Sequence, residues 1–511
     1  MPSNMGTVQN FIKTVRGLGV VPLLPIIFVP RASISFAIVI LAQLCRAVAR
    51  LFSSTSSYET KANLRILIVT DYMPPQTHGI AVRFQQYIEV MRKEGHEVQV
   101  FSTNLVKERE TSFDHPNLPS IQNPFNTSNL MAYNPGVKLA WYLGAKQWDL
   151  VHLVYPTNIG LAILPVCNWR RIPIYCSHHV EVEYYMYQYV GVRAIVHLGH
   201  FIYWLMVKYP AMLCANVNAG PTLCFLDSHM PKCTGARVRI PSGVADARFK
   251  IDSPAQLADE RRSLLSRIGA TAPTTIWLMV QRLAPEKDSS HALKALVHLK
   301  DLNQKRSSKL PFSVDGINTI HLVIAGDGPA RKSLEALVAK HDLPVTFLGN
   351  LKNDQLPPLY RAADVFITCS TSETYGLTVL EALACGTPAV MPRCPVFDEL
   401  WLHRVPNEWL YIHRDDDDML RALGAASAPA AKQRLIDSPI KASWRDATLE
   451  LLEQYKRAID ENMPYRKELA TYTRAFNYFL RAALVATALW LLTRAEVNLI
   501  KSLLMRVARA F

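Results

Sequence analysis

The chain alternates strand-like and helix-like segments in two separate blocks, and this alternation limits its fold more than any other feature. In the first block, strands are predicted at residues 64–69, 96–101, 150–154, 172–176 and 213–217, the first of them an apolar run without alternation. A helix is expected over 81–93, ending at Gly95. Apolar runs without polar alternation are typical of parallel strands that are covered on both faces.

The pattern restarts after Pro241-Ser242-Gly243. Strands are predicted at residues 275–280, 321–325, 345–348, 365–369 and 389–391. Helices are predicted from about 288, up to about 340, and over 377–384. Two blocks of this kind predict an α/β protein with two doubly wound, Rossmann-like domains facing a cleft. We expect these domains at 62–240 and 241–463, the second including a closing helix.

Ligands of doubly wound sheets bind beyond the carboxyl ends of the strands. Gly79 follows the first strand and precedes a helix, whose N-terminal amides attract phosphate. Arg282 and Lys287 follow the strand that ends at Val280, and both can bind phosphate. Two solvated surface cations are the alternative interpretation of that pair.

The most specific pattern runs from Glu373 to Glu381 and contains Gly376 at a predicted helix start. The glycine permits close approach of the backbone, and the amides that follow can cradle a diphosphate. Glu381, about two turns along, could accept hydrogen bonds from a ribose diol, and Glu373 from sugar hydroxyls. Paired carboxylates also occur in glycosidases, but here they flank a phosphate-type cradle with cations nearby.

With these motifs in order, residues 62–460 resemble the family 4 retaining glycosyltransferases of the GT-B fold. The matching landmarks are Gly79-Ile80, Arg282 with Lys287, Gly326-Asp327-Gly328-Pro329, and the two glutamates Glu373 and Glu381. The resemblance implies donor-binding roles for Gly79, Arg282, Lys287, Gly376, Leu377 and Thr378 at the diphosphate. It further implies that Glu381 binds the ribose and that Glu373 binds the donor sugar. The turn Gly349–Leu351, which includes Leu351, would contact the base.

A finer resemblance is to the sulfoquinovosyltransferases that make the plant sulfolipid. It rests on Arg83-Phe84-Gln85, on Ser177-His178-His179-Val180 and on Gly243-Val244, although Ala245 replaces a usual Asp. The resemblance implies a catalytic-site role for His179 together with Glu373, Arg282 and Lys287, with His178 as the alternative histidine. A sulfonated sugar needs a further cation, for which Arg83 is the candidate; a salt-bridged surface arginine is the alternative.

The resulting prediction is transfer of a sugar from a UDP-sugar, best UDP-sulfoquinovose, to a diacylglycerol-type lipid with retained anomeric configuration. The diphosphate would act as the base, and Arg282 and Lys287 would stabilise its charge. No cofactor is therefore expected to be required, and Mg²⁺ is indicated by no motif. The alternatives are a UDP-glucose- or GDP-mannose-dependent enzyme acting on diacylglycerol, phosphatidylinositol or a dolichol-linked acceptor, and a non-catalytic membrane-tethered scaffold.

Most of the net charge of +14 lies at the two ends of the 511-residue chain. Residues 1–61 carry six basic side chains against Glu59, and 464–511 carry eight against Glu468 and Glu496. A nearly neutral body argues against nucleic-acid binding. The ends are also apolar, and after Arg494 basic and apolar residues fall on opposite helix faces. This pattern predicts association with an anionic membrane surface; packing on the enzyme itself is the alternative.

Nine cysteines, an odd number without a C-x-x-C pair, indicate reduced thiols. The catalytic domains are therefore expected on the cytosolic or stromal side of a membrane, a plastid membrane if the sulfolipid resemblance holds. Oligomeric state is not predictable from these features.

Overall fold

The computed structural model describes residues 62–73, 79–102, 120–122, 130–132, 147–155, 172–180, 215–229, 236–245, 248–270, 273–305 and 320–467, with residues 163 and 167. The predicted membrane segment 1–61, and that at 464–511 apart from its first four residues, lie outside this part. Within it, no helix is both long and apolar enough to cross a bilayer.

The first sheet has six parallel strands in the order β2-β1-β5-β6-β7-β8. Its strands are β1 (Arg65–Val69), β2 (Glu97–Phe101), β5 (Leu150–Tyr155), β6 (Ile174–His178), β7 (Ala215–Gly220) and β8 (Ala236–Arg239). The helices α3 (Gly79–Lys93) and α8 (Leu223–His229) follow β1 and β7. A separate antiparallel pair, β3 (Ser120–Gln122) and β4 (Leu130–Ala132), lies in the same part of the chain.

The second sheet also has six parallel strands, in the order β11-β10-β9-β12-β13-β14. They are β9 (Thr275–Val280), β10 (Ile320–Ala325), β11 (Val345–Gly349), β12 (Val365–Ile367), β13 (Ala389–Pro392) and β14 (Leu410–Tyr411). Its helices are α9 (Pro254–Arg267), α10 (Ser289–Gln304), α12 (Arg331–His341), α13 (Leu356–Ala362), α14 (Leu377–Ala384), α15 (Pro395–Trp401), α16 (Asp416–Ser427) and α17 (Pro429–Asp437). Three short 3₁₀ turns, η1 (Pro285–Lys287), η2 (Asn353–Gln355) and η3 (Asn407–Trp409), lie between them. The two predicted doubly wound sheets are thus confirmed.

Both strand orders indicate where a ligand can bind. Strand order reverses next to β1 in the first sheet, between β1 and β5, and next to β9 in the second, between β9 and β12. The carboxyl ends of the strands at such a reversal open a crevice between diverging loops. The loops that follow β1, β9 and β12 are among those singled out in the sequence, together with the loop after β10.

The sequence predicted buried strands better than edge strands. β9 and α14 begin and end at the predicted residues, because both are strongly apolar and have clear boundaries. The edge strand β8 was not predicted: its four residues alternate arginine with small or apolar residues and remain partly exposed. Strand β6 lies two residues later than predicted and ends at His178, so that His179 follows it directly.

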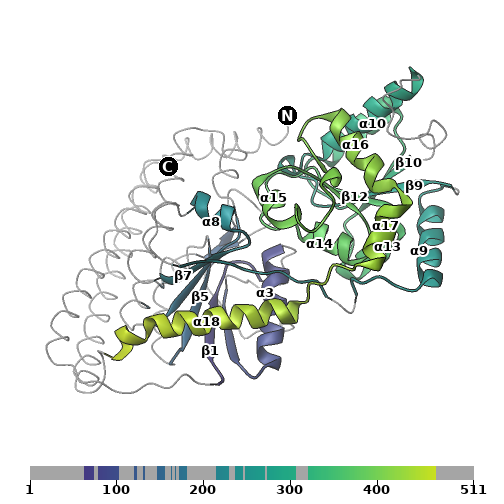
Figure 1. Ribbon diagram of the computed structural model, residues 1–511. Coiled ribbons are helices and arrows are strands. Elements are labelled where there is room, and N and C mark those ends of the chain that lie inside the picture. Colours follow the sequence, from purple (N-terminus) through teal and green to yellow (C-terminus); the bar gives the residue numbers. More distant parts are fainter. Residues whose placement is uncertain are drawn as a thin grey trace, which may run out of the picture.

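Helix α18 (Trp444–Lys467) follows the second domain in sequence but packs in the core of the first. Its buried residues Trp444, Leu451, Tyr455 and Ile459 join a cluster with strands of the first sheet and with α3. Figure 1 shows this helix running from the second domain across the first sheet. The first domain is therefore completed by the last described helix of the chain.

Two chain segments cross between the domains side by side. The Val244 amide donates to the Ala442 carbonyl at 2.8 Å, and a Cβ on Gly243 would lie 2.3 Å from the Trp444 nitrogen. No side chain larger than hydrogen fits at this position. On the other side of the interface, Glu399 of α15 accepts hydrogen bonds from the Leu223 and Cys224 amides at 2.8 Å. These contacts fix how the loops of one domain face those of the other.

Candidate functional site

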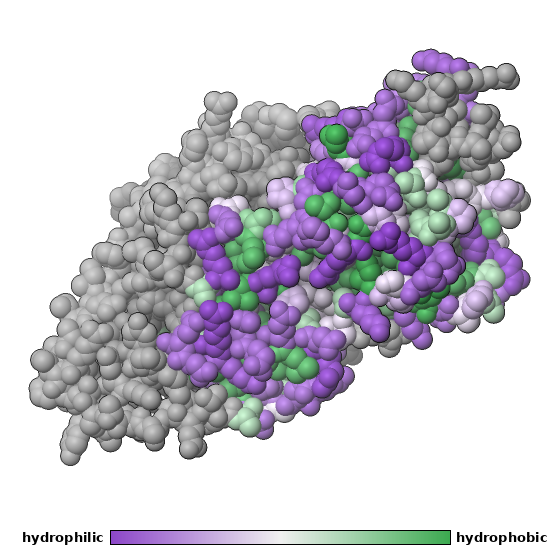
Figure 2. Space-filling model, in the orientation of Figure 1, coloured by the Kyte–Doolittle hydropathy of each residue, from purple (hydrophilic) through white to green (hydrophobic). Residues whose placement is uncertain are grey.

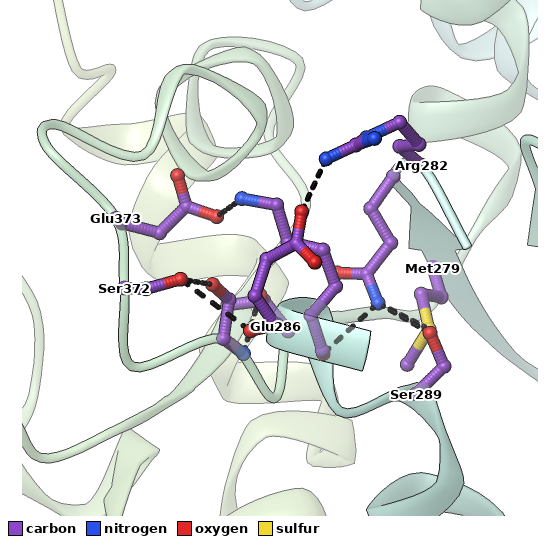
Figure 3. Close-up of polar contacts among 10 residues, drawn as sticks. Met279, Arg282, Glu286, Ser289, Ser372 and Glu373 are labelled. Atoms are coloured by element: carbon purple, nitrogen blue, oxygen red, sulfur yellow. Dashed lines mark hydrogen bonds and ion pairs between the residues drawn. The ribbon is translucent and has the colours of Figure 1, made fainter. Parts of the chain in front are cut away.

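The loop after β9 presents Arg282 and Lys287 above the second sheet. Arg282, an exposed side chain, forms an ion pair with Glu286, whose side chain is fully buried. The Gln281 side-chain amide donates to Ser289 at 2.8 Å and to the Lys287 carbonyl at 3.3 Å, which ties the loop to the start of α10. Figure 3 shows Arg282 with Glu286 and the polar contacts around them. Arg282 is thus held by a buried carboxylate but remains open to solvent.

Lys287 connects this loop with the loop after β12. Its Nζ lies 2.5 Å from Glu373 Oε1, and both side chains are mostly buried. Ser372, beside Glu373, donates to the Glu286 carbonyl at 3.4 Å, as Figure 3 also shows. The alternative of a solvated surface cation does not hold for Lys287, which is mostly buried in its ion pair. Arg282 is paired with Glu286 but remains exposed.

Gly326 and Gly328, in the third sequence landmark, support the cationic loop. Gly326 has a φ of +136°, and a Cβ there would lie 1.9 Å from the Gln281 carbonyl oxygen. A Cβ on Gly328 would lie 2.4 Å from the Leu283 carbonyl oxygen. In this contact the Leu283 amide donates a hydrogen bond to the Asp327 carbonyl at 2.9 Å. Gly326 and Gly328 therefore allow their backbone to pack closely against the loop that carries Arg282.

Gly376 forms the N-cap of α14 in the left-handed conformation, with φ 78°. A Cβ there would also lie 2.7 Å from the ring of Phe397. The amides of Leu377 and Thr378 occupy the first turn of the helix, where no intrahelical carbonyl is within reach. A Cβ on Gly79, the first residue of α3, would lie 3.8 Å from Leu377. The N-terminal ends of α3 and α14 therefore meet across the domain interface, and amides at two helix N-termini attract anions.

Glu381 lies about one turn into α14 and not two turns as predicted, because it is four residues beyond Leu377, where the helix begins, and one turn takes about 3.6 residues. It accepts a hydrogen bond from the Tyr360 hydroxyl at 2.8 Å. Burial raises the pKa of Glu381 to about 7, while Tyr360 and Arg248 act in the opposite direction. The carboxyl group lines a small pocket between the domains, together with Gln86 of α3, Arg248, Asn353 and Trp444.

Leu351 is partly buried against the second core and follows the turn at Gly349. Gly349 has a φ of +72°, and its carbonyl accepts a hydrogen bond from the Gly326 amide at 2.8 Å. The predicted base-binding turn thus lies beside the glycine that supports the Arg282 loop.

Arg83 belongs to the domain interface and is not on the surface. It is only 3% exposed, and its guanidinium lies over the Tyr375 ring, 5.5 Å from the ring centre. Its Nη1 has no hydrogen-bond partner among the described residues. The alternative of a salt-bridged surface arginine is therefore wrong. A buried guanidinium stacked on an aromatic ring keeps its charge available to an anion.

His179 follows β6 and is buried, as is His178. The His179 Nε2 lies 3.0 Å from the Ser177 hydroxyl, and its ring makes an edge contact with Phe84 of α3, 5.5 Å between centres. His179 therefore packs beside the helix that carries Arg83. No group of three or more His, Cys, Asp or Glu side chains in the described part could hold a metal ion.

Several residues of the site could not be identified from the sequence. Tyr360 and Arg248 reach Glu381 from separate elements, and Tyr375 stacks on Arg83 from the other domain. Tyr375 lies inside the predicted motif, but its partner is set only by how the domains face each other. Side-chain contacts of this kind depend on tertiary structure and not on spacing along the chain.

Two family models match the chain. The model described as "Glycosyltransferase Family 4" matches residues 77–215, and that described as "Glycosyl transferases group 1" matches residues 265–428. These ranges fall in the first and second domains and include Arg83, His179 and both motif glutamates. The chain is a family 4 glycosyltransferase with the GT-B fold.

The relatives of this glycosyltransferase include a glucosyldiacylglycerol synthase and a sulfoquinovosyl transferase. It is 26% identical to an alpha-monoglucosyldiacylglycerol synthase of Streptococcus pneumoniae, over 66% of this chain and 73% of the relative. It is 25% identical to sulfoquinovosyl transferase SQD2 of Arabidopsis thaliana, over 75% of this chain and 71% of that protein.

Among solved structures, HepE of Anabaena in complex with UDP and glucose aligns with a TM-score of 0.57 at 15% identity. The alignment covers 77% of this chain and all of HepE. At this level of identity the likeness shows the shared fold.

The raised pKa of Glu381 predicts how the stability of the enzyme changes with pH. Because the folded-state pKa of about 7 exceeds the ordinary value of 4.5, ionisation of Glu381 favours the unfolded chain as the pH rises between these values. The variant Glu381→Gln removes this effect. The urea midpoint of Glu381→Gln minus that of wild type should therefore be larger at pH 8 than at pH 5.

Glu89→Gln, on the exposed face of α3, is the matched control and should retain the wild-type dependence on pH. A Glu381→Gln variant whose midpoint changes with pH just as that of wild type does would contradict the predicted pKa.

Proposed function

We propose that this glycosyltransferase moves a sugar from a UDP-sugar to the hydroxyl of a diacylglycerol-type lipid and retains the anomeric configuration. The observation that carries the proposal is the meeting of two cations and two helix N-termini at the carboxyl ends of β9 and β12 and at the domain interface. A diphosphate is the ligand class that such a combination attracts most strongly.

The positions of the donor-binding residues support the roles that we propose for them. Arg282 and Lys287 bind the diphosphate, and the amides of Leu377 and Thr378 add hydrogen bonds. Glu381, in the interdomain pocket, accepts from the ribose hydroxyls. The reaction needs no protein nucleophile in this proposal. Glu373 is held by Lys287 at 2.5 Å, and a carboxylate in such an ion pair is a weak nucleophile.

The departing diphosphate instead takes the proton of the acceptor hydroxyl, which attacks from the same face. Arg282 and Lys287 stabilise the charge that grows on the phosphate, an effect worth on the order of 3 kcal/mol per donor. Positive charge from these side chains serves in place of a divalent metal, so the proposal includes no metal cofactor.

The donor we propose is UDP-sulfoquinovose, with sulfoquinovosyldiacylglycerol as the product. The buried, stacked Arg83 supports an anionic sugar: no carboxylate among the described residues pairs with it, and a buried guanidinium in that situation gains most from binding an anion. The similarity to SQD2 supports the same donor, and that to the glucosyldiacylglycerol synthase supports a diacylglycerol-type acceptor.

Comparison of donors tests this proposal. We expect label transfer to diacylglycerol in liposomes from UDP-sulfoquinovose in preference to UDP-glucose and GDP-mannose. Arg83→Gln should lower kcat/KM for UDP-sulfoquinovose by about tenfold or more, as expected for a lost charged hydrogen bond, and change the use of UDP-glucose little.

Lys93→Gln, at the exposed end of the same helix, should leave both donors unaffected. Exclusive use of a GDP-sugar would overturn the sulfolipid proposal. An equal loss with both UDP-sugars would show that Arg83 does not recognise the sulfonate.

We further propose that the two chain ends hold the enzyme on an anionic membrane, on the cytosolic or stromal side, and in a plastid if the donor is UDP-sulfoquinovose. Figure 2 shows a largely polar face of the described residues with scattered apolar side chains. The large exposed hydrophobic residues of this part, such as Val82 and Leu223, come from different elements. The support for membrane contact therefore comes from the sequence at the ends.

The basic residues after position 494 should govern this membrane binding. Replacing Lys501, Arg506 and Arg509 by Gln should weaken binding to phosphatidylglycerol vesicles by roughly 100-fold, from about 1 kcal/mol per cation at an anionic surface. Vesicle sedimentation at low and high salt measures the change.

The control replaces three exposed cations of the second domain, Arg262, Lys332 and Lys340, which changes the net charge equally. It should bind as wild type does. Equal binding by both triple variants would contradict a role for the C-terminal cations.

A further inference from the structure

A chain of buried polar groups connects α18 with His179. The Tyr455 hydroxyl lies 2.5 Å from His152 Nδ1, and His152 Nε2 lies 2.6 Å from the Ser177 hydroxyl. The same Ser177 oxygen lies 3.0 Å from His179 Nε2. Tyr455, His152 and Ser177 are completely buried, and His179 is 5% exposed.

The three elements that carry this chain are far apart in sequence. His152 lies in β5 and Ser177 in the neighbouring strand β6, while Tyr455 lies 303 residues beyond His152. Tyr455 can reach His152 only because α18 returns to the first domain. The rings of Tyr455 and His152 also make an edge contact, 5.6 Å between their centres.

The direction of the hydrogen bonds follows from the chemistry of His152. Burial lowers the pKa of His152 to about 3, so its imidazole is neutral and carries a single hydrogen. One ring nitrogen must therefore accept a hydrogen bond while the other donates one. The series of hydrogen bonds from Tyr455 to His179 can therefore be donated in only two directions.

In one direction Tyr455 would accept from His152, and its own hydroxyl hydrogen would need another acceptor. The described residues provide none for this fully buried hydroxyl, and an unsatisfied buried donor costs about 1–3 kcal/mol. In the other direction Tyr455 donates to His152 Nδ1, and His152 Nε2 donates to Ser177. Ser177 then donates its only hydrogen to His179 Nε2, and every group in the chain is satisfied.

We propose that Tyr455, His152 and Ser177 are positioning residues that fix the tautomer of His179, with the hydrogen on Nδ1. The inference deepens the proposed function, since it rests on the placement of His179 at the donor site. An accepting Nε2 leaves Nδ1–H as the only hydrogen-bond donor of the neutral ring. Any hydrogen bond from His179 to a hydroxyl of the donor sugar is then given by Nδ1.

A spectroscopic measurement tests the tautomer without reference to activity. In protein labelled with ¹⁵N at histidine rings, two-bond ¹⁵N–¹H correlations distinguish a protonated Nδ1 from a protonated Nε2, and His179→Gln assigns the signal. Wild type should show His179 with the hydrogen on Nδ1. Tyr455→Phe should give a mixture of tautomers, because without the tyrosine hydroxyl the hydrogen of His152 is no longer fixed on Nε2, and His152 can either donate to Ser177 or accept from it.

Tyr175→Phe is a closely matched control. Tyr175 is another fully buried tyrosine, and its ring lies 5.0 Å from that of His152 and 5.1 Å from that of Tyr455. Its hydroxyl has no hydrogen-bond partner among the described residues. Each variant removes one buried tyrosine hydroxyl from a ring that contacts His152, but only Tyr455→Phe interrupts the series of hydrogen bonds.

Kinetics with the full-length enzyme in liposomes give a second readout. Tyr455→Phe and Ser177→Ala should each lower kcat by roughly tenfold, the loss expected from one orienting hydrogen bond. Ser177→Thr, which keeps the hydroxyl, should restore most of the rate, and Tyr175→Phe should behave as wild type. Circular dichroism melting confirms that each variant folds.

Identical ring-nitrogen signals of His179 in wild type, Tyr455→Phe and Ser177→Ala would overturn the proposal, as would His179 with the hydrogen on Nε2 in wild type. If the tautomer responds as expected but no UDP-sugar is used by any variant, the positioning chain stands and the proposed function fails. The two failures are therefore distinguishable.

Discussion

The ion pair between Lys287 and Glu373 is the interaction on which the donor side of the molecule depends. It links the loop after β9 to the loop after β12 at 2.5 Å, at the position where the order of strands reverses. Two mostly buried side chains of opposite charge stabilise each other there, because either alone would be costly to bury. Arg282 and Glu286 form a second pair beside it.

These pairs explain how a nearly neutral enzyme body can hold a strongly charged ligand. Each cation has a carboxylate partner in the protein, so the loops are not forced apart by repulsion between Arg282 and Lys287. In the mechanism that we propose, a diphosphate replaces or shares those partners. In the same proposal, the helix amides of α3 and α14 add hydrogen bonds to the phosphate and stabilise the leaving group, while the buried Arg83 binds the anionic group of the sugar.

Sequence patterns were sufficient for features that depend on local composition. Buried strands such as Thr275–Val280 are apolar along their whole length, and the cation and glutamate motifs directly follow such strands. One error arose where local composition is uninformative, because the edge strand Ala236–Arg239 has no apolar run. The position of Glu381 along its helix was misjudged by one turn, although α14 begins at the predicted residue Leu377.

Contacts made by tertiary folding could not be predicted. Nothing near Arg83 indicates that it stacks on Tyr375 in the other domain, and nothing near His152 indicates a bond to Tyr455. Both depend on how the chain crosses between domains at Gly243 and Trp444. The site therefore consists of motifs that the sequence displays and supporting residues that only the fold brings to them.

The most direct measurement of the central claim is the affinity for UDP, which contains the diphosphate but no sugar, in wild type, Lys287→Gln and Glu373→Gln. If Lys287 binds the diphosphate, Lys287→Gln should weaken UDP binding by at least about tenfold, as a lost charged hydrogen bond does. Glu373→Gln should bind UDP at least as tightly as wild type, because it frees Lys287. Equal weakening by both substitutions, or no effect of Lys287→Gln, would contradict the assignment of the phosphate site.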